Sequence, residues 1–355
     1  MPSSLAQNPA SYPSSPQEKL QILWQRGCDF LKSRYGILGG AMTWVSERNL
    51  VSAISNAGGF GVLACGAMSP DLLKQEIIAT QSLTKHSFGV NLITMHPQFE
   101  ELMDVLIETK VSHAVLGGGL PTAPSINTLK KAGIRVICFA PALIIAKKLI
   151  KNGTDALILE GNEAGGHIGP VSTSVLAQEI LPILAKDLPI FIAGGIGRGE
   201  MMISYLEMGA SGCQLGTRFV CAFESRAHQN FKQAFIRANA RDALVSVQID
   251  ARFPVIPVRS LSNGATRSFL IAQQNAIDKY EKGLIDLKTA QLEIEHYWAG
   301  TLRKAVVEGD IENGSLMAGQ SVGMVCQEQS THDIIQELLA QAYHALETRT
   351  HSSSN

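Results

Sequence analysis

Eight short apolar segments, rich in β-branched residues, recur roughly 20–30 residues apart and constrain the fold more than any other feature of this sequence. They lie at 35–39, 61–65, 88–92, 113–116, 134–139, 156–159, 190–193 and 212–215. Most of the stretches between them carry an amphipathic helical pattern, at 72–83, 98–110, 142–152, 173–185 and 199–208. Eight strands that alternate with helices predict a (β/α)8 TIM barrel. A doubly wound open sheet is the alternative, which the number of repeats and the placement of glycines disfavour.

The two ends of the chain depart from this repeat. Ser, Pro, Ala and Gln dominate residues 1–16 of the 355-residue chain, and we expect a disordered tail there. A helix at 17–32 is expected to close the bottom of the barrel, so that the barrel spans 17–220. A C-terminal helix at 331–349 is expected to precede a second disordered tail, 350–355.

The segment 221–330, after the eighth strand, is predicted to be mostly helical. Helical patterns occupy 224–240, 266–282 and 289–308, and an irregular stretch with two prolines lies at 245–262. We expect this segment to form a lid that covers the barrel mouth and binds the substrate. An independent helical domain is the alternative, but no polar linker separates the segment from the barrel.

Charge and cysteine usage exclude several classes of protein. Lys and Arg number 30 against 31 Asp and Glu, so the net charge is −1 and no basic footprint for nucleic acid exists. The sequence has neither a signal-peptide pattern nor an 18-residue apolar run, so we expect a cytoplasmic protein without membrane association. Six cysteines without CxxC spacing and nine histidines without HxxxH spacing argue against disulfides and metal sites.

A glycine-rich stretch around His167 follows the sixth predicted strand and is the first candidate for chemistry. The glycines at 165, 166 and 169 allow the backbone to approach a ligand closely. Histidine takes up and releases protons near neutral pH, so His167 is a candidate for moving a proton at a bound cofactor. A tight turn with a solvent-facing histidine is the alternative interpretation.

Glycines also follow the seventh and eighth predicted strands, where TIM barrels commonly bind phosphate. Gly194 and Gly195 would permit a close approach of backbone N–H groups to an anion, and Gly216 with Thr217 would complete the cup. Structurally neutral turns are the alternative.

Two polar residues at strand ends suit a planar heterocyclic ligand. The amide of Asn91, at the end of the third strand, offers both a donor and an acceptor to a group such as a flavin. The carboxyl group of Glu160 can accept hydrogen bonds from ribityl hydroxyls. A turn residue for Asn91, and a capping or salt-bridging role for Glu160, are the alternatives.

Seven motifs in this order resemble one known superfamily from about residue 35 to about residue 328. The superfamily comprises the FMN-dependent nitronate monooxygenases, formerly called 2-nitropropane dioxygenases, and the type II flavin enoyl-ACP reductases. The resemblance implies a (β/α)8 barrel with a helical substrate domain. The motifs are Gly40-Ala-Met-Thr-Trp44, Ala57-Gly-Gly59, Phe88-Gly-Val-Asn91, Glu163-Ala-Gly-Gly-His167, Ala193-Gly-Gly-Ile196, Gln214-Leu-Gly-Thr-Arg218 and Met317-Ala-Gly-Gln320.

The resemblance also implies a set of FMN contacts and a catalytic residue. His167 matches the active-site histidine of the family. One departure is Gly39, at a position where family members usually have Gln. The implied FMN-binding residues are Ala41, Met42, Asn91, Glu160, Gly165, Gly194, Gly195, Gln214, Gly216 and Thr217.

The superfamily contains two chemistries, and we expect the first one here. A nitronate monooxygenase oxidises an alkyl nitronate with O2 to a carbonyl compound and nitrite. A flavin enoyl-ACP reductase passes hydride from NAD(P)H through FMN to an enoyl thioester, and the late segments 305–310 and 314–320 look like those of the reductases. A flavin-binding barrel without turnover is the third alternative. A small-molecule nitronate or enoyl thioester is the expected partner, and a homodimer is kept open as the oligomeric state.

Overall fold

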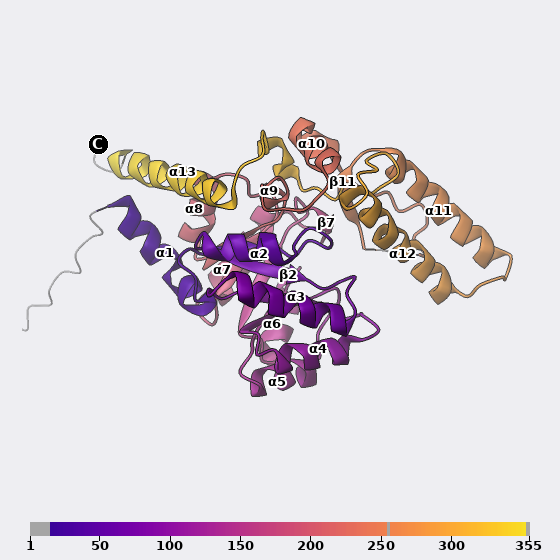
Figure 1. Ribbon diagram of the computed structural model, residues 1–355, viewed down its shortest axis with the longest axis horizontal. Helices are drawn as coiled ribbons and strands as arrows, with labels where there is room; N and C mark the ends of the chain where they lie inside the picture. The colour runs from indigo at the N-terminus through magenta and orange to yellow at the C-terminus, as the bar shows by residue number, and fades with distance from the viewer. Residues whose placement is uncertain (1–14, 254–255, 353–355) are drawn as a thin grey trace, which may run out of the picture.

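The computed structural model describes residues 15–253 and 256–352, and its central feature is a closed barrel of parallel strands (Figure 1). The strands follow the order β1-β2-β3-β4-β5-β6-β8-β9, and β1 pairs with β9 to close the barrel. The predicted (β/α)8 barrel is therefore confirmed, and an open sheet is excluded. The strands are β1 (Ile37–Gly39), β2 (Phe60–Ala64), β3 (Gly89–Ile93), β4 (His113–Gly117), β5 (Arg135–Phe139), β6 (Ala156–Glu160), β8 (Ile190–Ala193) and β9 (Gly212–Leu215).

Helices follow the strands around the outside of the barrel. Local capping explains several of their starts: Ser69 accepts the N–H of Leu72, and Thr122 accepts that of Ser125, each with a proline in the first turn. The sequence patterns missed α2 and α5, which have only nine residues each. The outer helices are α2 (Arg48–Asn56), α3 (Pro70–Leu83), α4 (Phe99–Glu108), α5 (Ala123–Lys131), α6 (Leu143–Lys151), α7 (Thr173–Leu184) and α8 (Gly199–Glu207).

Helix α1 (Pro16–Leu31) closes the bottom of the barrel, as predicted. Nε2 of His113, at the start of β4, lies 2.9 Å from the carbonyl oxygen of Phe30 near the end of α1, and Arg135 donates to the same carbonyl. The His113 ring is fully buried between the rings of Phe30 and Phe60. Burial lowers the pKa of His113 to about 4, because the charged imidazolium would lose its hydration there.

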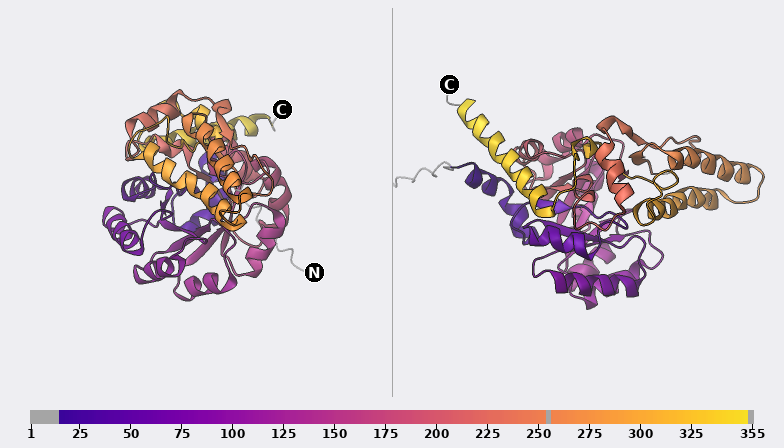
Figure 2. Two further views of the ribbon diagram at one scale, coloured as in Figure 1. Left: turned by 90° about the vertical axis from the view of Figure 1, so that its right-hand side faces the viewer. Right: turned by 45° about the horizontal axis from the view of Figure 1, so that its top comes forward.

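The chain after β9 leaves the barrel and builds a helical region on one side of it (Figures 1 and 2). The hairpin of α11 and α12 projects away from the barrel and has an apolar core of its own, which includes Phe269 and Trp298. The predicted helix at 224–240 is shorter in the structure, where α10 begins at Gln229. The helices are α9 (Thr217–Val220), α10 (Gln229–Arg237), α11 (Gly264–Glu281) and α12 (Leu287–Val306).

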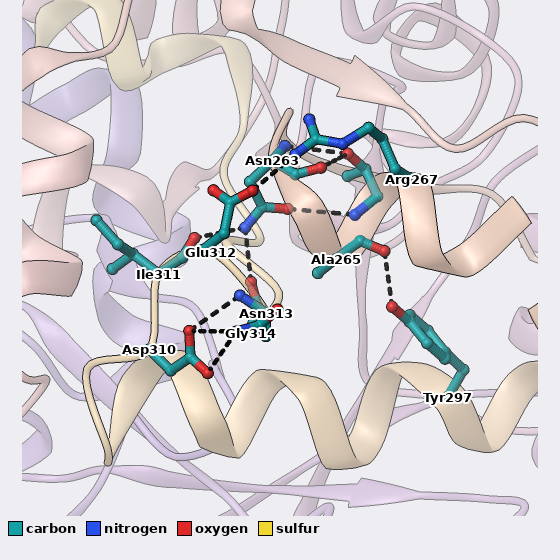
Figure 3. Close-up of polar contacts among 10 residues, drawn as sticks. Asn263, Ala265, Arg267, Tyr297, Asp310, Ile311, Glu312, Asn313 and Gly314 are labelled. Carbon is teal, nitrogen blue, oxygen red and sulfur yellow. Dashed lines mark hydrogen bonds and ion pairs between the residues drawn. The ribbon is translucent and has the colours of Figure 1, made fainter. Parts of the chain in front are cut away.

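A network of hydrogen bonds around Asn263 fixes the base of this hairpin (Figure 3). Nδ2 of Asn263 donates to the carbonyl oxygens of Ile311 and Gly314, at 2.6 and 2.8 Å, while Oδ1 accepts the N–H of Thr266. The Tyr297 hydroxyl donates to the carbonyl of Ala265 at 2.7 Å and joins α12 to the start of α11. These bonds hold the strand that leads into α11 and the chain that follows α12 together.

The prediction that residues 245–262 are irregular is wrong in one respect, because this stretch contains a strand. β11 (Val258–Leu261) pairs antiparallel with β10 (Ala243–Val245) on one side and with β7 (Gly166–His167) on the other. The histidine loop is therefore part of a small three-stranded sheet that it shares with the helical region. A two-residue strand whose partner lies far along the chain leaves no alternating pattern in the sequence.

Helix α13 (Thr331–Ser352) returns to the barrel, and the right-hand view in Figure 2 shows it beside the first helix, with its C-terminal end pointing away from the barrel. Its Glu337 pairs with the buried Arg218 at 3.0 Å, and Gln341 accepts the N–H of Gly199 at 2.8 Å. The helix continues to Ser352, so residues 350–352 are not the predicted tail. Likewise, α1 already begins at Pro16; residues 1–14 and 353–355, predicted to be disordered, lie outside the described residues.

Two further findings concern the described residues only. None of the helices there is long and apolar enough to cross a membrane. Within the same ranges, no group of three or more His, Cys, Asp or Glu side chains is arranged to hold a metal ion.

Candidate active site

The pairing register of the strands relates two of the predicted site residues, Glu160 of β6 and Gln214 of β9, near the carboxyl end of the barrel. Glu160 pairs in register with Ala193 of β8, which in turn pairs with Gln214 of β9. Ile158 and Ala193 belong to the cluster that fills the barrel interior, so alternation along β6 also directs Glu160 inward. Glu160 and Gln214 therefore form part of the uppermost interior layer.

Asn91 lies near the carboxyl end of β3 and points into the barrel. It pairs in register with Val115, which belongs to the interior cluster, and its Nδ2 donates to the carbonyl of Val115 at 2.9 Å. A side chain at Gly117 would come within 3.5 Å of that Nδ2, so the glycine leaves room around the amide. Nδ2 is partly used within the barrel, whereas the amide oxygen keeps its acceptor capacity.

Two of these groups lose hydration at a cost that the described residues do not offset. Oε1 of Gln214 is buried and has no hydrogen-bond partner there. Burial raises the pKa of Glu160 to about 8, since desolvation penalises its carboxylate form. An unpartnered buried polar group costs about 1–3 kcal/mol, so such groups point to a ligand that satisfies them. Amide and carboxyl groups near the carboxyl end of the barrel fit the donors and acceptors of a flavin.

The two glycines after β8 are required by their own loop. Gly194 and Gly195 have φ values of 101° and 71°, in the region that favours glycine. A Cβ at Gly194 would lie 2.9 Å from Oγ1 of Thr173, and one at Gly195 would lie 3.0 Å from Cβ of Glu163. The loop conformation, rather than ligand approach alone, therefore accounts for glycine at both positions.

Gly216 differs from those two glycines because a Cβ there would make only ordinary van der Waals contacts. The nearest atom to a Cβ there would be Sδ of Met42, at 3.5 Å. Met42, from the loop after β1, therefore lies beside the loop after β9, and the structure brings these two predicted residues together. Ala41 packs against the interior cluster of the barrel.

The late motif at 317–320 packs directly on the glycine-rich loops. The N–H of Gly319 donates to Oγ1 of Thr217 at 3.0 Å, and the N–H of Gln320 donates to the carbonyl of Glu163 at 2.9 Å. A Cβ at Gly165 would lie 2.5 Å from the nitrogen of Gly319. Gly165 therefore gives the late motif room to pass, and the Thr217 hydroxyl is engaged within the protein.

His167 is exposed on β7, where it pairs in register with Val258 of β11. The neighbouring residue of β11, Arg259, is buried, and its Nε donates to the carbonyl of Asn162 at 2.8 Å. A second bond joins Arg259 to the carbonyl of Ala243 in β10. Arg259 therefore holds the start of the histidine loop to the helical region, a role that the sequence patterns missed; a lone basic residue in a short apolar run was its only signal.

The structure also explains Gly39, the one departure from the family pattern. A Cβ at Gly39 would lie 2.5 Å from Cδ1 of Ile54 in α2. A side chain at this position would point toward the outer helices and not into the barrel. The next residue, Gly40, donates its N–H to the carbonyl of Leu215 at 2.9 Å and lies against the Gln214 side chain.

Comparison with known proteins identifies similar chains over nearly the whole length. A family model described as nitronate monooxygenase matches residues 25–103 and 93–341. A hydroxy-methyl-oxo-octahydro-indene-carboxyl-CoA dehydrogenase of Rhodococcus jostii is 31% identical, over 87% of this chain and 93% of that protein. A probable nitronate monooxygenase of Staphylococcus saprophyticus is 27% identical, over 88% of this chain and 96% of its own. The solved structure of FabK from Thermotoga maritima has a TM-score of 0.82 and 34% identity, and the match covers 92% of this chain and 98% of FabK.

Proposed function

Because this chain belongs to the nitronate monooxygenase family, we propose that it is an FMN-dependent oxidoreductase that oxidises alkyl nitronates with O2 to carbonyl compounds and nitrite. The observation that carries the proposal is that Glu160 and Gln214, each in register with Ala193 near the carboxyl end of the barrel, keep polar capacity that the described residues do not satisfy. Family members are oxidoreductases by name. Cytoplasmic location and a homodimer stay predictions.

The residues at the barrel mouth fit the two ends of FMN. Asn91, Glu160 and Gln214 would hydrogen-bond the heterocycle and the ribityl chain, with Ala41 and Met42 beside them. Gly194, Gly195, Gly216 and Thr217 would line the phosphate end, and Gly165 would contact FMN from the histidine loop. When bound, FMN supplies the redox chemistry, and the protein positions and polarises the substrate. At neutral pH the raised pKa of Glu160 keeps most of its carboxyl protonated, so that it can donate as well as accept.

His167 is the group that we propose moves a proton or binds the substrate anion. Its place on β7 fixes its backbone against β11, while its side chain remains exposed to an incoming substrate. The imidazole would take the proton from the α-carbon of a nitroalkane, or donate an N–H to a nitronate oxygen. Both roles require that the substrate is held beside the imidazole.

Reduction of an enoyl thioester is the second candidate, and two observations favour it. The late segment 314–320, which looks like that of the reductases, supplies the contacts from Gly319 to Thr217 and from Gln320 to Glu163. The name of the Rhodococcus relative also includes a CoA thioester. In this chemistry NAD(P)H is the hydride donor, and His167 would donate a hydrogen bond as the thioester enolate develops.

Two assays on the purified, FMN-loaded protein separate the candidates. The first follows O2 uptake and nitrite release from propyl-2-nitronate without NAD(P)H. The second follows anaerobic bleaching of the flavin by NADH or NADPH and its reoxidation by crotonyl-CoA. Nitrite release without nicotinamide supports the monooxygenase. Bleaching followed by thioester-dependent reoxidation assigns the reductase and overturns the first proposal, and inactivity in both assays contradicts both.

A further inference from the structure

Trp44, in the loop after β1, combines two unfavourable features in one residue. Its φ is 69°, in the left-handed region that a bulky side chain rarely adopts. Its indole Nε1 is buried and has no hydrogen-bond partner among the described residues. Strained backbone and unsatisfied donors persist in native proteins mainly where function requires them.

The loop that imposes this conformation is attached to the wall of the candidate site. The N–H groups of Val45 and Ser46 both donate to the carbonyl of Met42, at 2.9 and 2.8 Å. The Ser46 hydroxyl donates to the carbonyl of Gly40 at 3.0 Å, and Gly40 lies against the side chain of Gln214. The loop that carries Trp44 therefore contacts the side chain of Gln214 through Gly40.

A residue of the helical region contacts the ring of Trp44. The guanidinium carbon of Arg303, in α12, lies 5.8 Å from the centroid of the indole ring, within the range of a cation–π contact. Arg303 is itself paired with Glu308. Trp44 thus lies where the barrel mouth meets the helical region, which is the place where a substrate above the cofactor would be enclosed.

We propose that Nε1–H of Trp44 donates a hydrogen bond to an oxygen of the bound substrate, the nitro oxygen of a nitronate or the carbonyl oxygen of an acyl thioester. The inference rests on the proposed function. The buried donor acquires its partner only in the complex, which accounts for its lack of one within the protein. Arg303 is a positioning residue, because it acts by holding the ring.

Trp44→Phe tests this by removing the N–H while keeping an aromatic ring. Because the lost donor has no partner in the free protein, we expect its thermal midpoint to be unchanged or up to about 3 °C higher. The KM for the substrate should rise roughly three- to tenfold, with FMN content unchanged. Trp24→Phe is the matched control: the Trp24 N–H donates to Oε1 of Gln21 at 3.3 Å, so that variant should lose stability and keep its KM.

The substrate contact can also be read without turnover. The chain has three tryptophans, so labelling with ¹⁵N-tryptophan gives three indole signals, and Trp44→Phe identifies the one from Trp44. Addition of propyl-2-nitronate under anaerobic conditions, or of crotonyl-CoA without NAD(P)H, should move the Trp44 signal downfield and leave that of Trp24 in place. The compound that moves it identifies the class of substrate.

The outcomes distinguish this inference from the proposed function. A shifted Trp44 signal without turnover supports the inference and contradicts the function. An unmoved signal with both compounds overturns the inference, whether or not turnover is seen. A lower thermal midpoint with an unchanged KM in Trp44→Phe assigns Trp44 a purely structural role and also overturns it.

Discussion

The raised pKa of Glu160 predicts that the site destabilises the flavin-free protein as the pH rises. Burial moves this pKa from 4.5 to about 8, so between these values the folded state binds a proton that the unfolded state has released. The free energy of unfolding must therefore fall as the pH increases from about 5 to about 8. At 1.36 kcal/mol per pKa unit the shift corresponds to about 5 kcal/mol, and the partial exposure of Glu160 reduces our expectation to roughly 2–4 kcal/mol.

Glu160→Gln removes this penalty, because the amide cannot ionise. We expect the variant and the natural protein to have similar free energies of unfolding at pH 5, because this pH is only half a unit above the unfolded pKa of 4.5 and little of the penalty has accumulated there. At pH 8 the variant should be more stable by roughly 2–4 kcal/mol. The assay is urea denaturation of the flavin-free proteins at both pH values. Glu101→Gln, which removes an exposed carboxylate, is the control and should show no such change. The same difference between Glu160→Gln and the natural protein at pH 5 and at pH 8 would refute the reasoning.

Three further predictions test the bottom of the barrel, the glycine loop and the histidine. The lowered pKa of His113 means that the unfolded state binds one more proton than the folded state between pH 6.5 and about 4, so the free energy of unfolding should fall by roughly 2–3 kcal/mol as the pH drops through this window. In His113→Asn, the free energy of unfolding measured by urea denaturation should depend less on pH. The same pH dependence in the variant and the natural protein would contradict this prediction. Gly195→Ala should lower the thermal midpoint more than Gly133→Ala, since both have positive φ but a Cβ at Gly133 meets no atom within 4 Å; equal losses would show that the contact with the neighbouring loop is unimportant. His167→Ala should retain FMN and lower kcat by roughly 10²–10⁴-fold in the assay that the natural protein passes, and unchanged turnover would remove His167 from the mechanism.

The barrel strands could be predicted from the sequence because each is a local apolar run. Residues such as Ile190–Ala193 are buried on both faces, so the pattern is continuous and independent of the partner strand. The order of a (β/α)8 barrel then follows from the chain order. Asn91, Glu160 and Gln214 could be placed at the mouth for the same reason, since each lies at or near the carboxyl end of such a run.

The contacts between the barrel loops and the helical region could not be predicted. The pairing of Gly166–His167 with Val258 and Arg259 joins residues more than 90 positions apart, as does the bond from Gly319 to Thr217. Neither pairing leaves a periodic pattern, because it depends on how two regions meet in space. Trp44 shows the same limit: its motif is visible in the sequence, whereas its positive φ and unpartnered N–H are visible only in the structure.

The central claim is that the top layer of this barrel binds FMN, and a fluorescence-quenching titration of FMN with the flavin-free protein tests it most directly. We predict saturable binding of one FMN per chain, with an affinity lowered about tenfold or more in Gln214→Leu, because the variant lacks the buried Oε1 that would accept a hydrogen bond from FMN. Gln81→Leu, a substitution in an outer helix, should bind FMN as the natural protein does. Absence of FMN binding, or equal affinities in the natural protein and Gln214→Leu, would contradict the account.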